Sequence, residues 1–534
     1  MKKITSGLKL DVAVIGGGVA GTYSAWRLQK SGGKKKLAIG LFEYSDRIGG
    51  RLYSRTLPGM PNVVAELGGM RYIPSTQPLV TGLIDKLKLP SKDFPMGNPN
   101  KEIGASLNYY YLRGKHLKLY ELSEKGKIPY NVSWQEEGMN PDQLQAWVMK
   151  LYAAKMCAPI NPNPTLEQWF NLKVFGKYMY EIGYWNFLSQ VLTNEAYSYM
   201  SDAGGYDANV ANASTIAQLP ISDFGPTTEF RTLVKGYQSL PITLAEEFEK
   251  DGGQVYMNQR LKSIVKQKDG SYLLTFAATD TKDYTTTDAN NNKEVTVHAK
   301  KVILAMPRRS LELIEWNQFK DNEFLRNNIG SVLIQSAFKL FMGYDYAWWR
   351  SLNLWYGRSI TDLPIRQTYY FDVEGEQPNT GDPKNTKALL MASYNDISTV
   401  PYWKGLETGD EYAGNATSLK EGIDPNPPAE YKATQNMVDE AHRQVMQMHG
   451  LEKMDKPFAA IFHDWSGDPY GGGWHEWKAG YRYDEVIQKM IKPVGTEEVF
   501  IIGEAYSNNQ GWVEGSLETA ADMMERFFKL KFLP

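Results

Sequence analysis

The chain has 534 residues, more than one hydrophobic core usually supports, so we expect two or three domains. Of its residues 42% are hydrophobic and 22% are charged, and the formal net charge is only -2. This balance gives no electrostatic basis for binding nucleic acid or an acidic membrane surface, and we expect neither as a partner. The single cysteine, Cys157, excludes an internal disulfide and a metal cluster held by several thiolates.

The first predicted element is a strand–turn–helix unit near the N-terminus. Residues 12–15 (VAVI) form a short apolar run typical of a buried parallel strand, and residues 22–30 are predicted to be a helix. A second apolar run, residues 37–42, ends in Glu43, about 20 residues beyond the glycines of the turn, where a ribose-binding carboxylate is expected.

The turn itself carries the pattern Gly-x-Gly-x-x-Gly. Glycines at this spacing allow a tight turn, the close approach of a pyrophosphate and the close packing of helix on strand, while the helix N-terminus offers N–H groups to phosphate. The pattern therefore predicts a dinucleotide site. Its residues are Gly16, Gly18, Val19, Ala20, Gly21 and Glu43.

A second region of glycine and arginine follows the acid. Residues 45–55 read SDRIGGRLYSR, and residues 66–72 read ELGGMRY. A cofactor with a long ribityl arm and a buried ring requires more close backbone approaches than NAD does. At these residues the sequence resembles the FAD-dependent amine oxidase family, and the stretch from Gly69 to Arg71 resembles its L-amino acid oxidase branch. The resemblance implies that Gly50, Arg51, Gly69, Met70 and Arg71 contact FAD, and that Arg71 also binds the carboxylate of the substrate.

The resemblance also implies the fold: an α/β protein with a Rossmann-like FAD-binding domain, an interleaved α+β substrate-binding domain and a helical insertion. We expect the FAD-binding domain at residues 1–72, 234–326 and 457–534, the substrate domain at 73–129 and 327–456, and the insertion at 130–233. Helical spacing at residues 143–156, 166–170 and 181–192, between clusters of Pro and Asn, favours the insertion.

Several further elements are predicted between these landmarks. We expect a helix at 77–88, a hairpin at 107–117 and a returning glycine loop and helix at 230–248. We further expect a turn and a strand at 253–264, strands at 271–276, 295–298 and 301–305, and an exposed polar hairpin tip at 280–293. By resemblance, the backbone of Leu261 would contact the adenine.

Lys339 lies within an apolar strand, residues 336–341 (SAFKLF). Either the strand is at an edge and the lysine points outward, or the lysine is buried, which is costly without a partner. The flanking Phe338 and Leu340 favour burial. The resemblance implies that Lys339 holds a water molecule against the flavin N5 atom.

Residues 361–371 resemble the stretch in which an L-amino acid oxidase directs a tyrosine hydroxyl at the substrate carboxylate. Successive side chains of a strand face opposite sides, so only one of Tyr369 and Tyr370 can do this. We predict Tyr370, although this choice depends on the register of the strand.

Residues 500–520 resemble the closing FAD segment of the family, with a strand at 500–502, a turn, and a helix from Gly515. The resemblance implies that Glu504 binds ribityl or ribose hydroxyls and that Val513 approaches the isoalloxazine carbonyls. Gly511 would accept a hydrogen bond from the substrate amine, and Trp512 would form an aromatic wall beside substrate and cofactor. No cysteine is present here, so we expect the FAD to be non-covalent. Six scattered histidines, His463 and His475 among them, show no metal-ligand spacing, and we expect no metal.

These features predict a flavin-dependent L-amino acid oxidase, which turns an L-amino acid and oxygen into a 2-oxo acid, ammonia and hydrogen peroxide. The alternatives are an amine or polyamine oxidase, a decarboxylating amino-acid monooxygenase, and a non-catalytic FAD-binding module. Arg71 argues against amines, which lack a carboxylate. By family resemblance we expect a homo-oligomer. The N-terminus shows no apolar segment of a signal peptide, so we expect a cytoplasmic protein.

Overall fold

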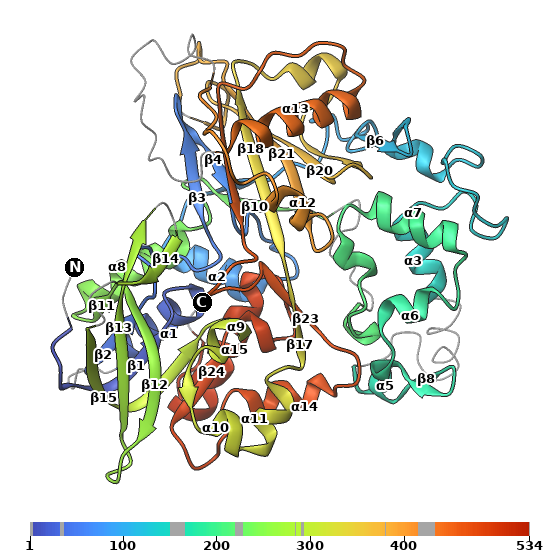
Figure 1. The fold of residues 1–534 in the computed structure, drawn as a ribbon. Helices are drawn as coiled ribbons and strands as arrows, with labels where there is room; N and C mark the ends of the chain where they lie inside the picture. The colour runs from blue at the N-terminus through green and yellow to red at the C-terminus, as the bar shows by residue number, and fades with distance from the viewer. Residues whose placement is uncertain are drawn as a thin grey trace.

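The computed structural model describes residues 4–31, 37–149, 166–218, 228–282, 285–289, 293–379, 381–414 and 433–532. It is a mixed α/β structure with two large sheets. In Figure 1 the nine-stranded sheet lies at the lower left, the seven-stranded sheet above it, and a group of short helices to the right. None of the helices in these ranges is long and apolar enough to cross a lipid bilayer.

Parallel strands form the centre of the nine-stranded sheet. They are β1 (Leu8–Ile15), β2 (Ile39–Phe42), β11 (Gln254–Tyr256), β15 (Glu294–Ala305) and β24 (Val499–Ile502). Because all five run in the same direction, their carboxyl ends meet at one edge, where ligands of such sheets bind. The glycine turn after β1 is at this edge.

Antiparallel strands extend the sheet on one side. They are β12 (Gln259–Lys266), β13 (Tyr272–Lys282) and β14 (Thr285–Asp288), with the short parallel β16 (Glu315–Trp316) beside β12. The prediction of two strands at 295–298 and 301–305 is wrong, because β15 is continuous. Its lysines Lys300 and Lys301 do not mark a turn, since they form ion pairs with Asp11 and Glu498. Residues 253–264, expected to form a turn and a strand, contain β11 and the start of the separate strand β12.

Helices cover the nine-stranded sheet and share a hydrophobic core with it. They are α1 (Val19–Ser31), α2 (Pro78–Leu87), α8 (Ser239–Lys250) and α15 (Val513–Phe528). Tyr23 and Trp26 of α1 are almost fully buried in this core. The packing fixes the N-termini of α1 and α15, and both reach the cavity described below.

The seven-stranded sheet has the order β22 (Ala459–Asp464), β18 (Ala337–Tyr344), β21 (Ala388–Asp396), β20 (Gln367–Val373), β19 (Gly357–Thr361), β6 (Tyr109–Leu112), β7 (Lys115–Lys118). The helices α12 (Val400–Lys404) and α13 (Gln435–His449) pack against it. The predicted hairpin at 107–117 is confirmed as β6 and β7. Because β18 lies between β22 and β21, it is not an edge strand, and Lys339 is only 3% exposed. The buried alternative for this lysine is therefore correct.

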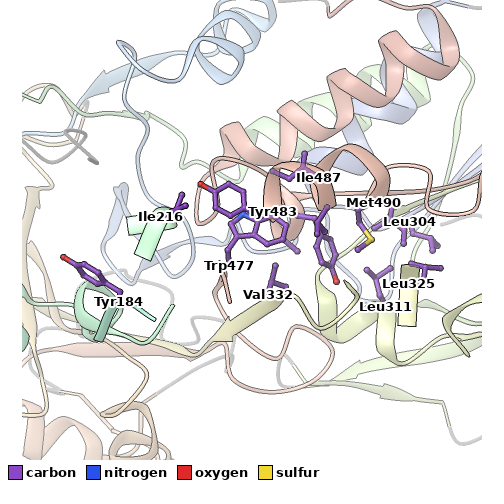
Figure 2. Close-up of a cluster of buried hydrophobic side chains, with 14 of the residues drawn as sticks. Tyr184, Ile216, Leu304, Leu311, Leu325, Val332, Trp477, Tyr483, Ile487 and Met490 are labelled. Atoms are coloured by element: carbon purple, nitrogen blue, oxygen red, sulfur yellow. The ribbon is translucent and has the colours of Figure 1, made fainter. Parts of the chain in front are cut away.

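The helical segment consists of α3 (Pro141–Met149), α5 (Leu166–Asn171), α6 (Tyr184–Leu188) and α7 (Asn194–Gly204). The helix predicted at 181–192 is shorter, because Gly183 caps its start. Part of the helix predicted at 143–156 and Cys157 lie outside the described residues. Figure 2 shows how Tyr184 and Ile216 belong to the same hydrophobic cluster as Trp477 and Leu304. This cluster joins the segment to the rest of the molecule.

The remaining elements are short. The strands are β3 (Ser54–Leu57), β4 (Met60–Glu66), β5 (Ser91–Asp93), β8 (Lys173–Val174), β9 (Lys177–Tyr178), β10 (Arg231–Leu233), β17 (Val332–Gln335) and β23 (Trp474–Trp477). The helices are α9 (Arg308–Glu312), α10 (Gln318–Asp321), α11 (Glu323–Asn328) and α14 (Tyr483–Met490). The 3-10 helices are η1 (Leu119–Ser123), η3 (Met179–Glu181), η4 (Asp207–Val210), η5 (Thr215–Gln218), η7 (Trp348–Leu352) and η8 (Glu504–Tyr506).

Candidate active site

A cavity of about 840 Å³ is lined by residues of both sheets and of the helical segment. It extends from the glycine turn after β1, past Lys339 of β18, to Tyr206 beyond α7. Every site residue predicted from the sequence lines it except Gly21 and Tyr370. The structure thus brings together residues that are hundreds of positions apart in the chain.

The three glycines of the turn have different surroundings. A Cβ atom at Gly21 would lie 1.9 Å from the carbonyl oxygen of Gly16, so this glycine serves close packing and does not line the cavity. A Cβ at Gly16 would lie 2.3 Å from the carbonyl oxygen of Ala305, and its φ is +114°. At Gly18 the nearest atom would be 3.9 Å away. The missing side chain of Gly18 therefore leaves open space at the N-terminus of α1, as a phosphate cradle requires.

Glu43 is fixed at the end of β2 by hydrogen bonds from the backbone. Its Oε2 atom accepts a bond of 2.7 Å from Gly17 N–H, and its Oε1 atom accepts bonds of 2.9 and 2.7 Å from the backbone and hydroxyl of Ser45. The Oε2 atom retains a lone pair, since a carboxylate offers about four acceptor positions. Glu43 and Leu261 both line the cavity, as a ribose and adenine site requires.

Glu504 lines the cavity and accepts four hydrogen bonds from protein groups. Its Oε1 atom accepts bonds from the backbone N–H of His475 (2.9 Å) and Gly511 (2.7 Å), and its Oε2 atom from Arg51 Nη1 (2.8 Å) and His475 Nδ1 (2.8 Å). Burial alone raises the pKa of this carboxyl, but Arg51 and His475 hold it well below the usual range. These four donors use about four acceptor positions of the carboxylate, and its bonds to ribityl or ribose hydroxyls stay a prediction. Glu504 fixes Arg51 and the loop at Gly511 on the cavity wall.

The amine of Lys339 points at two backbone carbonyl groups that lie shortly before Arg71 in the chain. Its Nζ atom donates to the carbonyl oxygens of Gly68 (2.5 Å) and Glu66 (3.1 Å) and lies 4.6 Å from the ring centre of Tyr394. Burial lowers the pKa of Lys339 to about 7; the charge of Glu66 opposes this shift and that of Arg71 adds to it. The amine therefore exchanges a proton near neutral pH.

Arg71 is held between aromatic rings at the cavity wall. It is 5% exposed, and its guanidinium carbon lies 4.1 Å from the ring centre of Phe230 and 5.3 Å from that of Phe94. Its Nη1 atom contacts the sulfur of Met96 at 2.9 Å. Aromatic faces fix the plane of a guanidinium group, and a fixed plane favours bidentate binding of a carboxylate.

The prediction for Tyr370 is wrong. Its hydroxyl lies 2.6 Å from both Ser359 Oγ and His449 Nε2, in the core between the sheet and α13. Tyr369 faces the other side of β20, with its ring centre 5.7 Å from the Arg71 guanidinium carbon and its hydroxyl 3.3 Å from that of Tyr206. A register shift in β20 precedes Tyr369, and the sequence alone does not show which phase the strand takes.

Sequence reasoning did not identify several residues of the cavity wall. They are Asp142, Tyr206, Gln218, Arg358, Tyr394 and Glu476. Tertiary packing brings them together from distant parts of the chain. Within the ranges that the structure describes, no group of three or more His, Cys, Asp or Glu side chains could hold a metal ion.

The glycine turn, the ribose-type acid and the adjoining cavity define a dinucleotide-binding protein with room for a small substrate. The sequence profile of the flavin-containing amine oxidoreductase family matches residues 19–411, and the chain belongs to this family. The family expected from the sequence is thereby confirmed.

Relatives with curated descriptions match along almost the whole chain. Aplysianin-A of Aplysia kurodai is 29% identical over 97% of this chain and 90% of its own. Achacin of Lissachatina fulica is also 29% identical, over 97% and 93%. An L-amino-acid oxidase of Demansia vestigiata is 24% identical over 96% and 87%.

The solved structure of putrescine oxidase bound to putrescine has a similar fold. It aligns with 97% of this chain and 100% of its own with a TM-score of 0.64, at 17% sequence identity. At this identity the likeness concerns the fold alone.

Proposed function

We propose that the protein is an FAD-dependent L-amino acid oxidase, which converts an L-amino acid, water and oxygen into a 2-oxo acid, ammonia and hydrogen peroxide. The observation that carries the proposal is the buried, aromatic-clamped guanidinium of Arg71 in the same cavity as Lys339 and the dinucleotide turn. An amine substrate would offer no carboxylate to this guanidinium. Relatives named L-amino-acid oxidase support the assignment.

The residues present fit a bound FAD. The open cradle at Gly18, the oriented carboxylate of Glu43 and the backbone at Leu261 would hold the pyrophosphate, ribose and adenine. The N-terminus of α15 at Val513 would stabilise negative charge at the pyrimidine side of the ring. When bound, the flavin supplies the two-electron redox chemistry.

The side chains of this protein would position the substrate and exclude water. Arg71 binds the carboxylate bidentately, which fixes its position. The carbonyl of Gly511 accepts a hydrogen bond from the amine, and Trp512 closes one side. With a pKa near neutrality, Lys339 holds or releases a proton beside the reacting atoms. We assign no other side chain as a base.

A substrate screen tests this proposal. We expect hydrogen peroxide from L-amino acids, and little or none from their D-enantiomers or from the amines that lack the carboxylate. Peroxide formed faster from amines than from any L-amino acid would contradict the proposal.

The FAD is expected to be non-covalent. The cavity wall includes no cysteine among the residues that the structure describes, so no thiolate there can form a bond to the ring. Acid precipitation should release the yellow flavin into the supernatant. A yellow pellet under a clear supernatant would contradict this expectation.

Lys339→Met is expected to slow the oxidation of the flavin by oxygen about tenfold or more, and its reduction by substrate much less. General acid–base help by one positioned side chain is worth on the order of 10²–10⁴-fold at most. Methionine keeps the length and apolar stem of lysine but removes the proton. Stopped-flow measurement of the two half-reactions checks this prediction. Our assignment of Lys339 fails if reduction alone becomes slower.

A further inference from the structure

Glu476 is a carboxylate on the cavity wall that none of the roles above uses. It belongs to β23 and lines the same cavity as Arg71. Its neighbour Trp477 is buried in the hydrophobic cluster that Figure 2 shows. Because side chains alternate along a strand, Glu476 faces away from this cluster, on the same side as Trp474, which also lines the cavity.

Neutral side chains alone hold the carboxylate of Glu476. Its Oε1 atom accepts a hydrogen bond of 3.0 Å from Gln218 Nε2, and its Oε2 atom accepts one from the amide of Gln335. No lysine, arginine or histidine within the described ranges forms an ion pair with it. Each oxygen therefore keeps an acceptor position for a further donor.

The surroundings of Glu476 are negative as well as buried. Burial, with smaller contributions from the charges of Asp396 and Glu504, raises its pKa to about 7, although the hydrogen bonds from Gln335 and Gln218 oppose this shift. Burying such a carboxylate costs free energy unless a cation pairs with it. Groups with a shifted pKa in a cavity are candidates for functional sites. The nearby ring of Trp474 would also attract a cation.

Glu476 and Arg71 line the same cavity, and Tyr394 lines it as well. Tyr394 and Asp396 are two positions apart on β21 and therefore face the same side of the sheet. The charge of Arg71 acts on Tyr394, while Asp396 acts on both Tyr394 and Glu476. A substrate whose α-carboxylate is at Arg71 would extend its side chain within this cavity toward Glu476.

We propose that Glu476 binds the positively charged end of the substrate side chain, so the preferred substrates are L-amino acids that carry an ammonium or guanidinium group, as lysine and arginine do. This inference rests on the proposed oxidation of L-amino acids. It adds to Arg71 a second residue that binds the substrate. Gln218 and Gln335 then position the carboxylate of Glu476.

Three substrates separate the roles of Arg71 and Glu476. L-Norleucine is L-lysine without its terminal amine, and cadaverine is lysine without its carboxylate. We expect the wild type to oxidise L-lysine or L-arginine about tenfold to a hundredfold more efficiently than L-norleucine, as expected for a hydrogen bond between charged groups. In Glu476→Gln this preference should disappear, with L-norleucine changed less than about threefold.

Gln335→Met is the matched control, because it removes a donor to Glu476 but keeps the charge. Because Gln335 only positions the carboxylate, we expect the preference for L-lysine over L-norleucine to fall by less than it does in Glu476→Gln. If Gln335→Met alters their ratio as much as Glu476→Gln does, the shape of the wall and not its charge selects the substrate, and the inference fails. Flavin content and thermal unfolding show whether each variant is folded.

The substrate preference of the wild type tests the inference even if a variant does not fold. Equal oxidation of L-norleucine and L-lysine would overturn the role of Glu476 and leave the L-amino acid oxidase assignment intact. Faster oxidation of cadaverine than of L-lysine, or no oxidation of any L-amino acid, would overturn both.

Discussion

Arg71→Ala is expected to lower kcat/KM for the best L-amino acid by about thirtyfold to several thousandfold, while FAD remains bound. Removing one partner of a desolvated, hydrogen-bonded charge pair typically costs ~2–5 kcal/mol, and ~1.4 kcal/mol corresponds to a factor of ten. Steady-state kinetics on the amino acid, with the flavin content of the purified variant, checks this prediction.

The control for Arg71→Ala is the amine that remains when the carboxylate of the same substrate is removed. For this amine we expect kcat/KM of the variant to equal or exceed that of the wild type, because the amine offers Arg71 no carboxylate. The clamp of Phe230 and Phe94 around the guanidinium also allows a structural role. If the variant loses its flavin, or fails equally on acid and amine, Arg71 supports the fold and is not the carboxylate anchor.

Gly18→Ala is expected to fold normally and to lose affinity for FAD by roughly tenfold to a hundredfold. The added methyl group meets no protein atom closer than 3.9 Å, yet it fills the space that the pyrophosphate requires. Overpacking by one methyl group costs ~1–3 kcal/mol, which corresponds to this range of affinities. Titration of the flavin-free protein with FAD, together with its thermal unfolding, measures both quantities.

Gly21→Ala provides the opposite control within the same motif. Its Cβ would lie 1.9 Å from the Gly16 carbonyl oxygen, so we expect the flavin-free protein itself to be unstable. If Gly18→Ala destabilises the flavin-free protein as much as Gly21→Ala does, or binds FAD as tightly as the wild type, then Gly18 is not the phosphate cradle.

Local patterns were sufficient to predict the elements that position the dinucleotide site. The apolar run before Gly16 and the acid at Glu43 are where the glycine spacing predicts, because strand, turn and helix are adjacent in the chain. The burial of Lys339 was predicted from its apolar neighbours Phe338 and Leu340, and all three side chains are buried because β18 is an interior strand.

The sequence was insufficient where a side chain depends on distant partners. The phase of β20 decides between Tyr369 and Tyr370, and it is set by pairing with β21 and by the core around His449. Arg51 and His475, which supply three of the four donors to Glu504, are distant from it in the chain. The sequence alone therefore does not show that these groups bond to its carboxylate. The role of Glu476 was not predicted, because only the pairing of β17 with β23 brings it to Gln335.

The products formed from the best L-amino acid test the central proposal most directly. A decarboxylating monooxygenase would also use Arg71, so substrate preference alone does not separate the two reactions. We predict one 2-oxo acid, one ammonia and one hydrogen peroxide for each oxygen consumed. Carbon dioxide and an amide one carbon shorter, or a bound flavin that no L-amino acid reduces under nitrogen, would contradict the proposal that this protein is an L-amino acid oxidase.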